Sequence, residues 1–547
     1  MLTALLLAAT FTRMLERVST MDPAMATSVY DAHAVQLVYE TPLEIDYKAR
    51  PYRLVPGFCE LPEVSSDGLT YVFKVKSKSE VGQRKSNLHC TTTTNIYDSA
   101  NVVRSLERLR DPKVVSPNGW IMKDVDVIKA LGPRAVAIRL KRRCHFFPWL
   151  MALSACGVVG PNGEGSGPYE LTHWRKNHEM VFKRKSEPEY PPSEASCAAG
   201  AMRGVGAGQR NSNLHCTTTT TNYDLFDTIR YLVVDDASTQ WLMFLKGELD
   251  FLESVSRDNF DSIVGADGRL DAALEKAGVR LFSIPTLEVL HFGINMRDPV
   301  LGPNRRLRQA LNAAFDYPAW EKFYNGRILP CSTPVPPGVD GRLERRAPYA
   351  FDLEKAKRLM AEAGYPGGID PKTGRRLVLT MSIGRASQES REAGELAAAF
   401  YEKIGIKLEL AFMTWDAFLK AVNEGRVQMF RMGWVGDYPD AQNFLQLFYS
   451  KNASPGPNHA NYANPEFDRE YDAALASASA ADRNRHWARC QEIVMEDCPW
   501  VFTHVNKAYS LVRPTVKNYV PTDFPYGVEK YYEAGRGTRS RSREKLR

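Results

Sequence analysis

The stretch "GIKLELAFMTWDAFLKAVNEG", residues 405–425, has the pattern of a half-buried strand followed by a helix. Every second residue of its first part is apolar: Ile406, Leu408, Leu410 and Phe412. This alternation predicts a strand with those side chains on its buried face. Thr414 belongs to a residue type that caps helices, so we expect a helix to begin there. A strand that leads into a helix is the repeating unit of α/β proteins.

The same strand and helix patterns occur elsewhere in the chain. Residues 69–76 and 135–142 alternate as strands do, and residues 226–252 have the order strand, helix, strand. "FDLEKAKRLMAEAGYPGG", residues 351–368, predicts a helix that Asp352 caps and that ends at Gly364. Its apolar stripe is Leu353, Ala356, Leu359, Met360 and Ala363. We therefore expect compact α/β lobes, in which sheets are covered by helices and ligands bind in clefts.

Composition narrows the class of protein. The chain has 547 residues, 44% of them hydrophobic and 25% charged, which is enough for two or three lobes with hydrophobic cores. The net charge is +7, but the last twelve residues, "RGTRSRSREKLR", hold six Arg or Lys against one Glu. The rest of the chain is nearly neutral, so we expect no nucleic-acid partner and a solvated basic tail at 536–547.

The N-terminus is compatible with export, and the cysteines do not form the pattern of a disulfide framework. "MLTALLLAAT" has a short apolar core but no basic residue before it, so it fits either the remnant of an export signal or a buried first strand. No run reaches the ~18 apolar residues that a membrane span needs. The nine cysteines are scattered, with no C-x-x-C pair, and none lies before Cys59 to carry a lipid anchor.

Motifs of catalysis are not found. The chain contains no G-x-S-x-G, H-E-x-x-H or phosphate-binding loop, and "GVGAGQ" at 204–209 lacks the third glycine of a dinucleotide site. "SNLHCTTTT" occurs at 86–94 and again at 212–220. Each copy places a His beside a Cys (His89 and Cys90; His215 and Cys216). Four such ligands would suit zinc, and the competing hypothesis is a zinc-dependent hydrolase. Adjacent extended residues point apart, so a duplicated low-complexity insertion is the preferred interpretation.

Seven segments in order resemble solute-binding protein family 5, the dipeptide- and oligopeptide-binding components of bacterial ABC importers. They are 17–48, 54–76, 165–174, 238–252, 305–316, 351–366 and "GWVGDYPDAQNFLQLFY" at 433–449. The similarity covers about residues 15 to 530, interrupted by the two Thr-rich copies.

The resemblance implies an α/β fold: a two-lobed periplasmic binding protein of type II, cluster C-like, with an extra subdomain on the N-terminal lobe. Lobe I would comprise 1–50 (after a truncated signal), 160–285 and a return at 505–535. The extra subdomain would be 51–159 and lobe II 286–504. Such a protein is not an enzyme. As a monomer in the periplasm, it would capture di- to oligopeptides and deliver them to ABC permease subunits in the inner membrane, without a cofactor or metal.

The resemblance also implies a ligand site within residues 430–449. In peptide-binding members, the aspartate of the pattern G-W-x-x-D-Y pairs with the ligand's α-ammonium group, and that role falls on Asp437. A buried ammonium needs a carboxylate, and such a hydrogen bond contributes about 1.5–3 kcal/mol. Trp434 would wall the pocket, and Arg431 would meet a ligand carboxylate. The family also includes binders of nickel, haem, opines and oligosaccharides, which stay open as alternatives.

Three further residues complete the predicted ligand-binding set: Gly433, Gly436 and Tyr438. A fully extended chain would separate Arg431 from Asp437 by about 20 Å, so we expect a bend at Gly433 or Gly436. Tyr438 and Asp440 also fit a structural role. In the alternative interpretation Asp437 and Asp440 are turn residues beside Pro439, and the aromatic residues are core.

Overall fold

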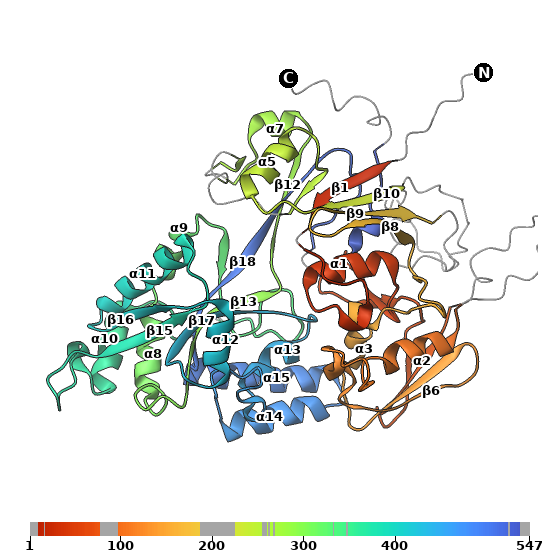
Figure 1. Cartoon of the computed structure of the whole chain (residues 1–547). Helices are drawn as coiled ribbons and strands as arrows, with labels where there is room; N and C mark the ends of the chain where they lie inside the picture. The colour runs from red at the N-terminus through yellow and green to blue at the C-terminus, as the bar shows by residue number, and fades with distance from the viewer. Residues whose placement is uncertain are drawn as a thin grey trace, which may run out of the picture. The chain divides into compact units, whose positions relative to one another are not determined.

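The computed structural model describes residues 9–15, 17–76, 97–185, 225–253, 260, 263–265, 268–331, 333–345, 348–522, 524 and 526–535. Both copies of "SNLHCTTTT", the 204–209 segment and the basic tail lie outside these residues. The chain forms two compact units, Met1–Ile284 with Ala508–Arg547, and Pro285–Lys507. Figure 1 shows their helices and strands.

The first unit contains a mixed sheet in the order β11-β1-β10-β9-β8. Its strands are β1 (Thr10–Met14), β8 (Tyr169–Arg175), β9 (Glu179–Arg184), β10 (Thr228–Leu232) and β11 (Phe251–Leu252). The parallel pair β1 and β10 places Phe11 beside Ile229, and both are fully buried in one core with Leu37 of α1 (Val29–Val38). The helices α5 (Ala237–Leu245) and α7 (Ala272–Lys276) and strand β12 (Arg280–Pro285) complete this part.

A separate four-stranded antiparallel sheet, in the order β4-β5-β7-β6, also belongs to the first unit. Its strands are β4 (Glu63–Val64), β5 (Thr70–Lys74), β6 (Val125–Ala130) and β7 (Ala135–Leu140), and α2 (Ser99–Glu107) packs on β6 and β7. Strands β5 and β7 confirm the predicted alternation, because Phe73, Val136 and Ile138 are buried. The short elements β2 (Leu43–Ile45), β3 (Leu54–Pro56) and α3 (Phe147–Leu150) lie next to these strands in the sequence.

The second unit contains the sheet β16-β15-β17-β13-β18. Its strands are β13 (Glu288–Ile294), β15 (Val378–Ile383), β16 (Lys407–Phe412), β17 (Met429–Val435) and β18 (Trp500–Val512), with β14 (Ile328–Pro330) paired to β18. Strand β18 crosses the boundary at Ala508, and its residues Leu511 and Val512, which belong to the first unit, pair with β11 there. Strand β15 is parallel to both β16 and β17, which is the arrangement that strand–helix–strand units produce.

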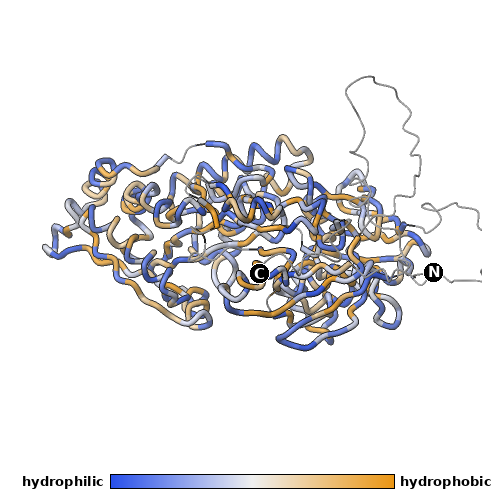
Figure 2. Tube along the Cα trace, turned by 90° about the horizontal axis from the view of Figure 1, so that it is seen from above, coloured by the Kyte–Doolittle hydropathy of each residue, from blue (hydrophilic) through white to orange (hydrophobic). Residues whose placement is uncertain are grey.

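Helices flank this sheet and bury their apolar sides. They are α8 (Arg305–Ala313), α9 (Tyr317–Phe323), α10 (Leu353–Glu362), α11 (Gln388–Glu402), α12 (Trp415–Asn423), α13 (Ala441–Leu445), α14 (Pro465–Ala476) and α15 (Ala480–Asp497). The predicted cap of α10 is confirmed, because the Asp352 side chain accepts a hydrogen bond from the backbone of Lys355. Ala356, Leu359 and Met360 are buried as predicted. Figure 2 shows hydrophobic and hydrophilic residues alternating along the trace, as amphipathic elements require.

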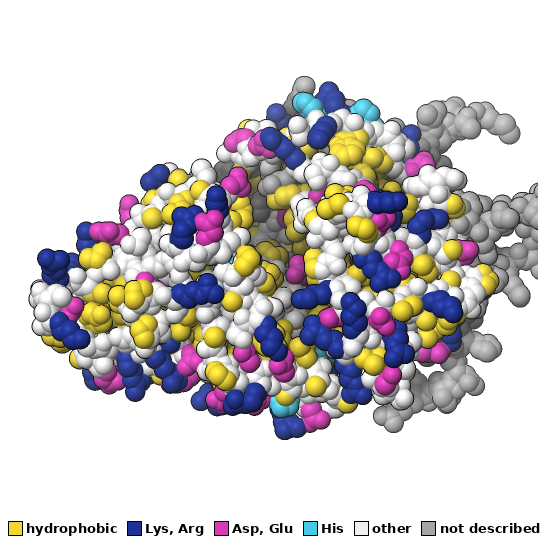
Figure 3. Space-filling view, turned by 60° about the horizontal axis from the view of Figure 1, so that its bottom comes forward, with side chains coloured by type: hydrophobic (Ala, Val, Ile, Leu, Met, Phe, Trp, Pro, Cys, Tyr) yellow, Lys and Arg dark blue, Asp and Glu magenta, His cyan; other side chains and the backbone are white. Residues whose placement is uncertain are grey.

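The mixture of charges on the surface and the free cysteines agree with what the composition predicts. In Figure 3 Asp and Glu side chains are interspersed among those of Lys and Arg. Among the described residues, no helix is both long enough and apolar enough to span a bilayer. The cysteines that the structure describes are free and buried, at positions 59, 144, 156, 331, 490 and 498.

Candidate functional site

The predicted ligand residues lie on β17 and the turn that follows it. Strand β17 is antiparallel to β13, with Phe292 opposite Arg431 and Leu290 opposite Gly433. Side chains alternate across a strand, so Arg431 and Trp434 point to opposite faces of the sheet. On one face, Phe430 and Met432 pack with Phe418 of α12. Trp434 belongs to this face, and Arg431 belongs to the other.

Trp434 and Asp437 meet through a third residue, Asn443. The Trp434 indole Nε1 donates to Oδ1 of Asn443 at 3.0 Å, and the Asp437 backbone N donates to the same oxygen at 3.1 Å. Nδ2 of Asn443 donates to Oδ2 of Asp437 at 3.1 Å. Burial raises the pKa of the Asp437 carboxyl, and the hydrogen bond from Asn443 opposes that rise. Among the described residues, Asp437 has no cationic partner.

Arg431 lies in different surroundings. Its Nη2 donates to the hydroxyl of Tyr324 at 2.8 Å, and the Tyr324 ring lies 5.0 Å from that of His504. Burial and the charge of Arg431 lower the pKa of His504 to about 3, and Trp320 donates to its Nδ1 at 3.1 Å. His504 is therefore neutral at neutral pH. Arg431 forms no ion pair with any acid that the structure describes.

The two glycines differ. Gly433 lies inside β17, so the chain stays extended there, and of the two positions predicted for the bend it is Gly436 that takes it. The strand ends at Val435, and the turn begins at Gly436, whose backbone N donates to the Leu287 carbonyl at 2.7 Å. A Cβ atom at Gly436 would lie 2.8 Å from Cζ of Phe444, so only glycine fits without displacing a neighbour.

Tyr438 and Asp440 hold the turn. Tyr438 is only 2% exposed, and its hydroxyl donates to Oε1 of Gln442 at 2.5 Å. Nε2 of Gln442 donates in turn to the hydroxyl of Tyr471 at 2.7 Å. Asp440 caps α13 by accepting a hydrogen bond from the backbone of Gln442 at 2.8 Å. These contacts orient the helix that carries Asn443.

Strand β17 has an open edge beyond Arg431. Its pairing with β15 covers only Met429, Phe430 and Arg431, because β15 ends at Ile383. Residues 432–435 have no partner strand on that side among the strands that the structure describes. Unpaired backbone groups of this kind can bind an extended peptide as an additional strand.

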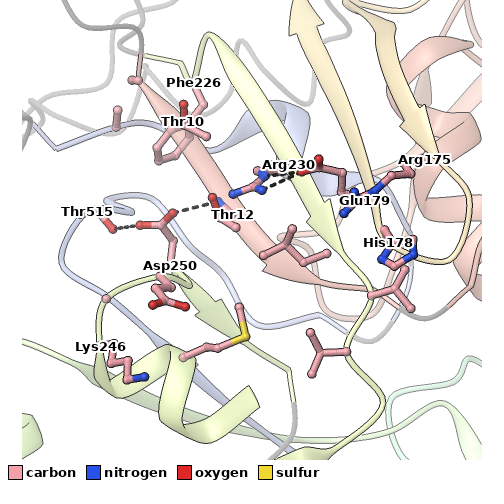
Figure 4. A pocket seen from close by; sticks show the side chains of 18 of the residues that line it. Thr10, Thr12, Arg175, His178, Glu179, Phe226, Arg230, Lys246, Asp250 and Thr515 are labelled. Carbon is pink, nitrogen blue, oxygen red and sulfur yellow. Dashed lines mark hydrogen bonds and ion pairs between the residues drawn. The ribbon is translucent and has the colours of Figure 1, made fainter. Parts of the chain in front are cut away.

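A separate hollow of about 1040 Å³ lies in the first unit (Figure 4) and contains none of the predicted ligand residues. Arg230 donates to Oε2 of Glu179 at 2.7 Å, and Asp250 accepts hydrogen bonds from Thr515 and from the backbone of Thr12. The acids Glu179 and Asp250 are thus paired within the wall. No group of three or more His, Cys, Asp or Glu side chains able to hold a metal occurs among the described residues.

Comparison with known proteins identifies the chain. The model of the bacterial extracellular solute-binding proteins, family 5, matches residues 21–456. The chain belongs to this family. The resemblance found from the sequence is therefore confirmed, and this family 5 protein is a transport binding protein rather than an enzyme.

Named relatives cover nearly the whole chain. Heme-binding protein A of Haemophilus influenzae is 24% identical over 89% of this chain and 85% of its own length. Glutathione-binding protein GsiB of Escherichia coli is 23% identical over 90% and 88%.

Solved structures establish the fold. HbpA2 of Haemophilus parasuis has a TM-score of 0.76 at 20% identity, covering 96% of this chain and 99% of that one. DppA of Helicobacter pylori, in complex with the peptide STSA, has a TM-score of 0.69 at 19% identity, covering 96% and 97%. The predicted two-lobed α/β binding-protein fold is confirmed.

Sequence reasoning missed two residues of this site. Tyr324 lies 107 positions before Arg431, and no local pattern connects them. Asn443 follows Asp437 by six residues, and its position three residues after the helix cap Asp440 was the available signal. A helix begun at Asp440 turns back toward the preceding strand, and this brings Asn443 to Asp437.

Proposed function

We propose that this family 5 protein captures peptides outside the cytoplasm and that Asp437 binds their α-ammonium group. The observation that carries the proposal is a half-buried carboxylate with a raised pKa and no cationic partner among the described residues. An ion removed from water without a counter-charge costs free energy, and a ligand ammonium would remove that cost. Asn443 occupies Oδ2 of Asp437, which leaves Oδ1 for the ligand.

Arg431 supports a ligand that carries both charges. It is a half-buried cation without an acidic partner among the described residues, and its guanidinium can bind a carboxylate through two hydrogen bonds. The open edge of β17, between Arg431 and Asp437, would hydrogen-bond the peptide backbone. Gly433, exposed on this edge, would let a ligand approach the strand closely, and Trp434 would wall the ammonium pocket.

The relatives' names favour ligands with an amino group. GsiB is named for glutathione, a tripeptide with a free α-ammonium group, and DppA was solved with a peptide. Heme-binding protein A is named for haem, whose propionates would be repelled by an uncompensated Asp437 carboxylate. A peptide is therefore preferred over haem.

We further propose that the two units are the two lobes, with residues 51–159 as the extra subdomain, and that the protein acts as a periplasmic monomer. It would deliver its ligand to the permease subunits of an ABC transporter in the inner membrane. Family membership supports this assignment. Fractionation of cells that express the full chain tests the location, and a purely cytoplasmic pool would contradict it.

The test of the ligand class compares the parent protein with Asp437→Asn. Calorimetric titration uses a mixed library of di- to pentapeptides and the same library after N-acetylation. Removing one partner of a buried ion pair costs on the order of 3–5 kcal/mol, so Asp437→Asn should bind at least about a hundredfold more weakly. Acetylation should abolish binding to the parent. Equal binding of free and acetylated peptides by the parent would show that the amine is not recognised.

A further inference from the structure

Asn443 is buried between the two residues that the proposed function needs most. It lies in α13 and is 0% exposed. Its side-chain amide contacts the Trp434 indole, the Asp437 backbone N and the Asp437 carboxylate, at 3.0, 3.1 and 3.1 Å. One amide group thus connects the end of β17, the turn and the helix.

The orientation of this amide follows from the chemistry of its partners. An indole N–H and a backbone N–H can only donate, so the amide oxygen must face both. The NH₂ group is then directed to the Asp437 carboxylate, which accepts. A flipped amide would set donor against donor twice and an oxygen against a carboxylate. The network therefore permits one orientation only.

The helix that carries Asn443 is itself held in place. The capping hydrogen bond from Asp440 and the chain of contacts from Tyr438 through Gln442 to Tyr471 order its first turn. Phe444, fully buried, packs against Gly436 on the turn. The amide of Asn443 therefore has little freedom to move, and neither do the groups bonded to it.

We propose that Asn443 is a positioning residue for ligand recognition, holding the Asp437 carboxylate and the Trp434 indole in the arrangement that receives an ammonium group. The proposal rests on the proposed function of Asp437. By occupying Oδ2, Asn443 directs Oδ1 toward the ligand. A site that is organised before binding does not spend binding free energy on ordering these side chains.

The variant Asn443→Leu tests this, because leucine has a similar size but no hydrogen-bonding group. The same free and N-acetylated peptide libraries serve as probes. A hydrogen bond to a charged group contributes about 1.5–3 kcal/mol, so affinity for free peptides should fall about tenfold or more. The carboxylate also loses the donor that stabilises its ionised form, so the loss of binding on acidification should move to higher pH.

Asn458→Leu is the matched control. Asn458 is also 0% exposed, and its amide donates to the carbonyls of Tyr449 and Tyr462, away from Asp437. It should lower the melting temperature as Asn443→Leu does, without moving the pH profile of binding. A double variant, Asp437→Asn with Asn443→Leu, should lose less affinity than the sum of the two single losses, because part of the effect of Asn443 acts through the Asp437 carboxylate.

A measurement on the parent protein covers the case in which Asn443→Leu fails to fold. With ¹⁵N-labelled tryptophan, the indole resonance of Trp434, assigned with Trp434→Phe, should titrate with the Asp437 carboxyl and stop titrating in Asp437→Asn. An indole resonance that does not respond to Asp437 would overturn the positioning role. So would an Asn443→Leu variant that keeps the affinity and pH profile of the parent while Asp437→Asn has lost binding. Normal binding by Asp437→Asn would instead overturn the proposed function itself.

Discussion

Arg431 donates a 2.8 Å hydrogen bond to the hydroxyl of Tyr324, on the face of β17 opposite to that of Trp434. The cation and the carboxylate of the predicted site thus depend on different supports, Tyr324 for Arg431 and Asn443 for Asp437. Substitutions can therefore weaken recognition of one end of a peptide without disturbing the other.

Arg431→Gln should weaken binding of peptides with a free carboxylate but leave C-terminally amidated peptides unaffected. Gln keeps a polar side chain on this strand but removes the charge, and a charge-assisted hydrogen bond contributes about 1.5–3 kcal/mol, or tenfold or more in affinity. Titration calorimetry with matched acid and amide peptides measures the difference. Arg426→Gln, at an exposed arginine paired with Glu424, is the control. An equal loss for both peptide forms would contradict carboxylate recognition.

Peptide binding should weaken on acidification, starting above the pH at which an ordinary aspartate titrates. Burial raises the pKa of Asp437, and only its ionised form attracts an ammonium group. Below that raised pKa the affinity should fall about tenfold per pH unit. Titrations between about pH 4 and 8 measure it. A flat profile, or a loss only at the ordinary aspartate pKa, would contradict the buried setting of this carboxylate.

Gly436→Ala should destabilise the second unit, whereas Gly433→Ala should not. A Cβ atom at Gly436 would lie 2.8 Å from Phe444 and 2.9 Å from Leu287, both buried, while at Gly433 the nearest atom, in Leu290, is an ordinary 3.4 Å away. Overpacking typically costs about 1–3 kcal/mol. Thermal and urea unfolding of the two variants provide a matched pair. Equal melting temperatures would show that the turn adjusts at no cost.

Glu40→Gln should stabilise the first unit at neutral pH. Glu40 is 5% exposed, and its Oε2 is buried without a hydrogen-bond partner among the described residues. Burial, and repulsion by Glu44, raise the pKa of Glu40 to about 8. Between the usual glutamate pKa of about 4.3 and this value, the folded state binds the additional proton, so stability falls as pH rises, by up to about 1.4 kcal/mol per unit.

Glu40→Gln should remove this decline in the free energy of unfolding with rising pH, because glutamine stays neutral at every pH. Urea unfolding at several pH values measures the free energy of unfolding of both proteins. Glu248→Gln, at an exposed position, is the control and should keep the parent slope. A parent protein whose stability does not decline over this range would contradict the raised pKa.

The sequence by itself determined the elements and much of their arrangement. Alternation predicted β5, β7 and β16, and Asp352 predicted the start of α10, because caps and periodicity depend on interactions within a few residues of the chain. The order of seven segments predicted the family and so the fold.

Only the tertiary structure decided how the site is assembled. From the sequence, the bend before Asp437 was equally plausible at either of two glycines. Pairing with β13 keeps Gly433 inside a strand, whereas the close contact with Phe444 leaves room only for glycine at Gly436. Because side chains alternate along β17, Arg431 and Trp434 lie on opposite faces of the sheet. Tertiary packing brings Tyr324 to Arg431, although the two are 107 residues apart in the sequence. Such contacts depend on how whole elements pack together, and no local pattern encodes which residues will meet.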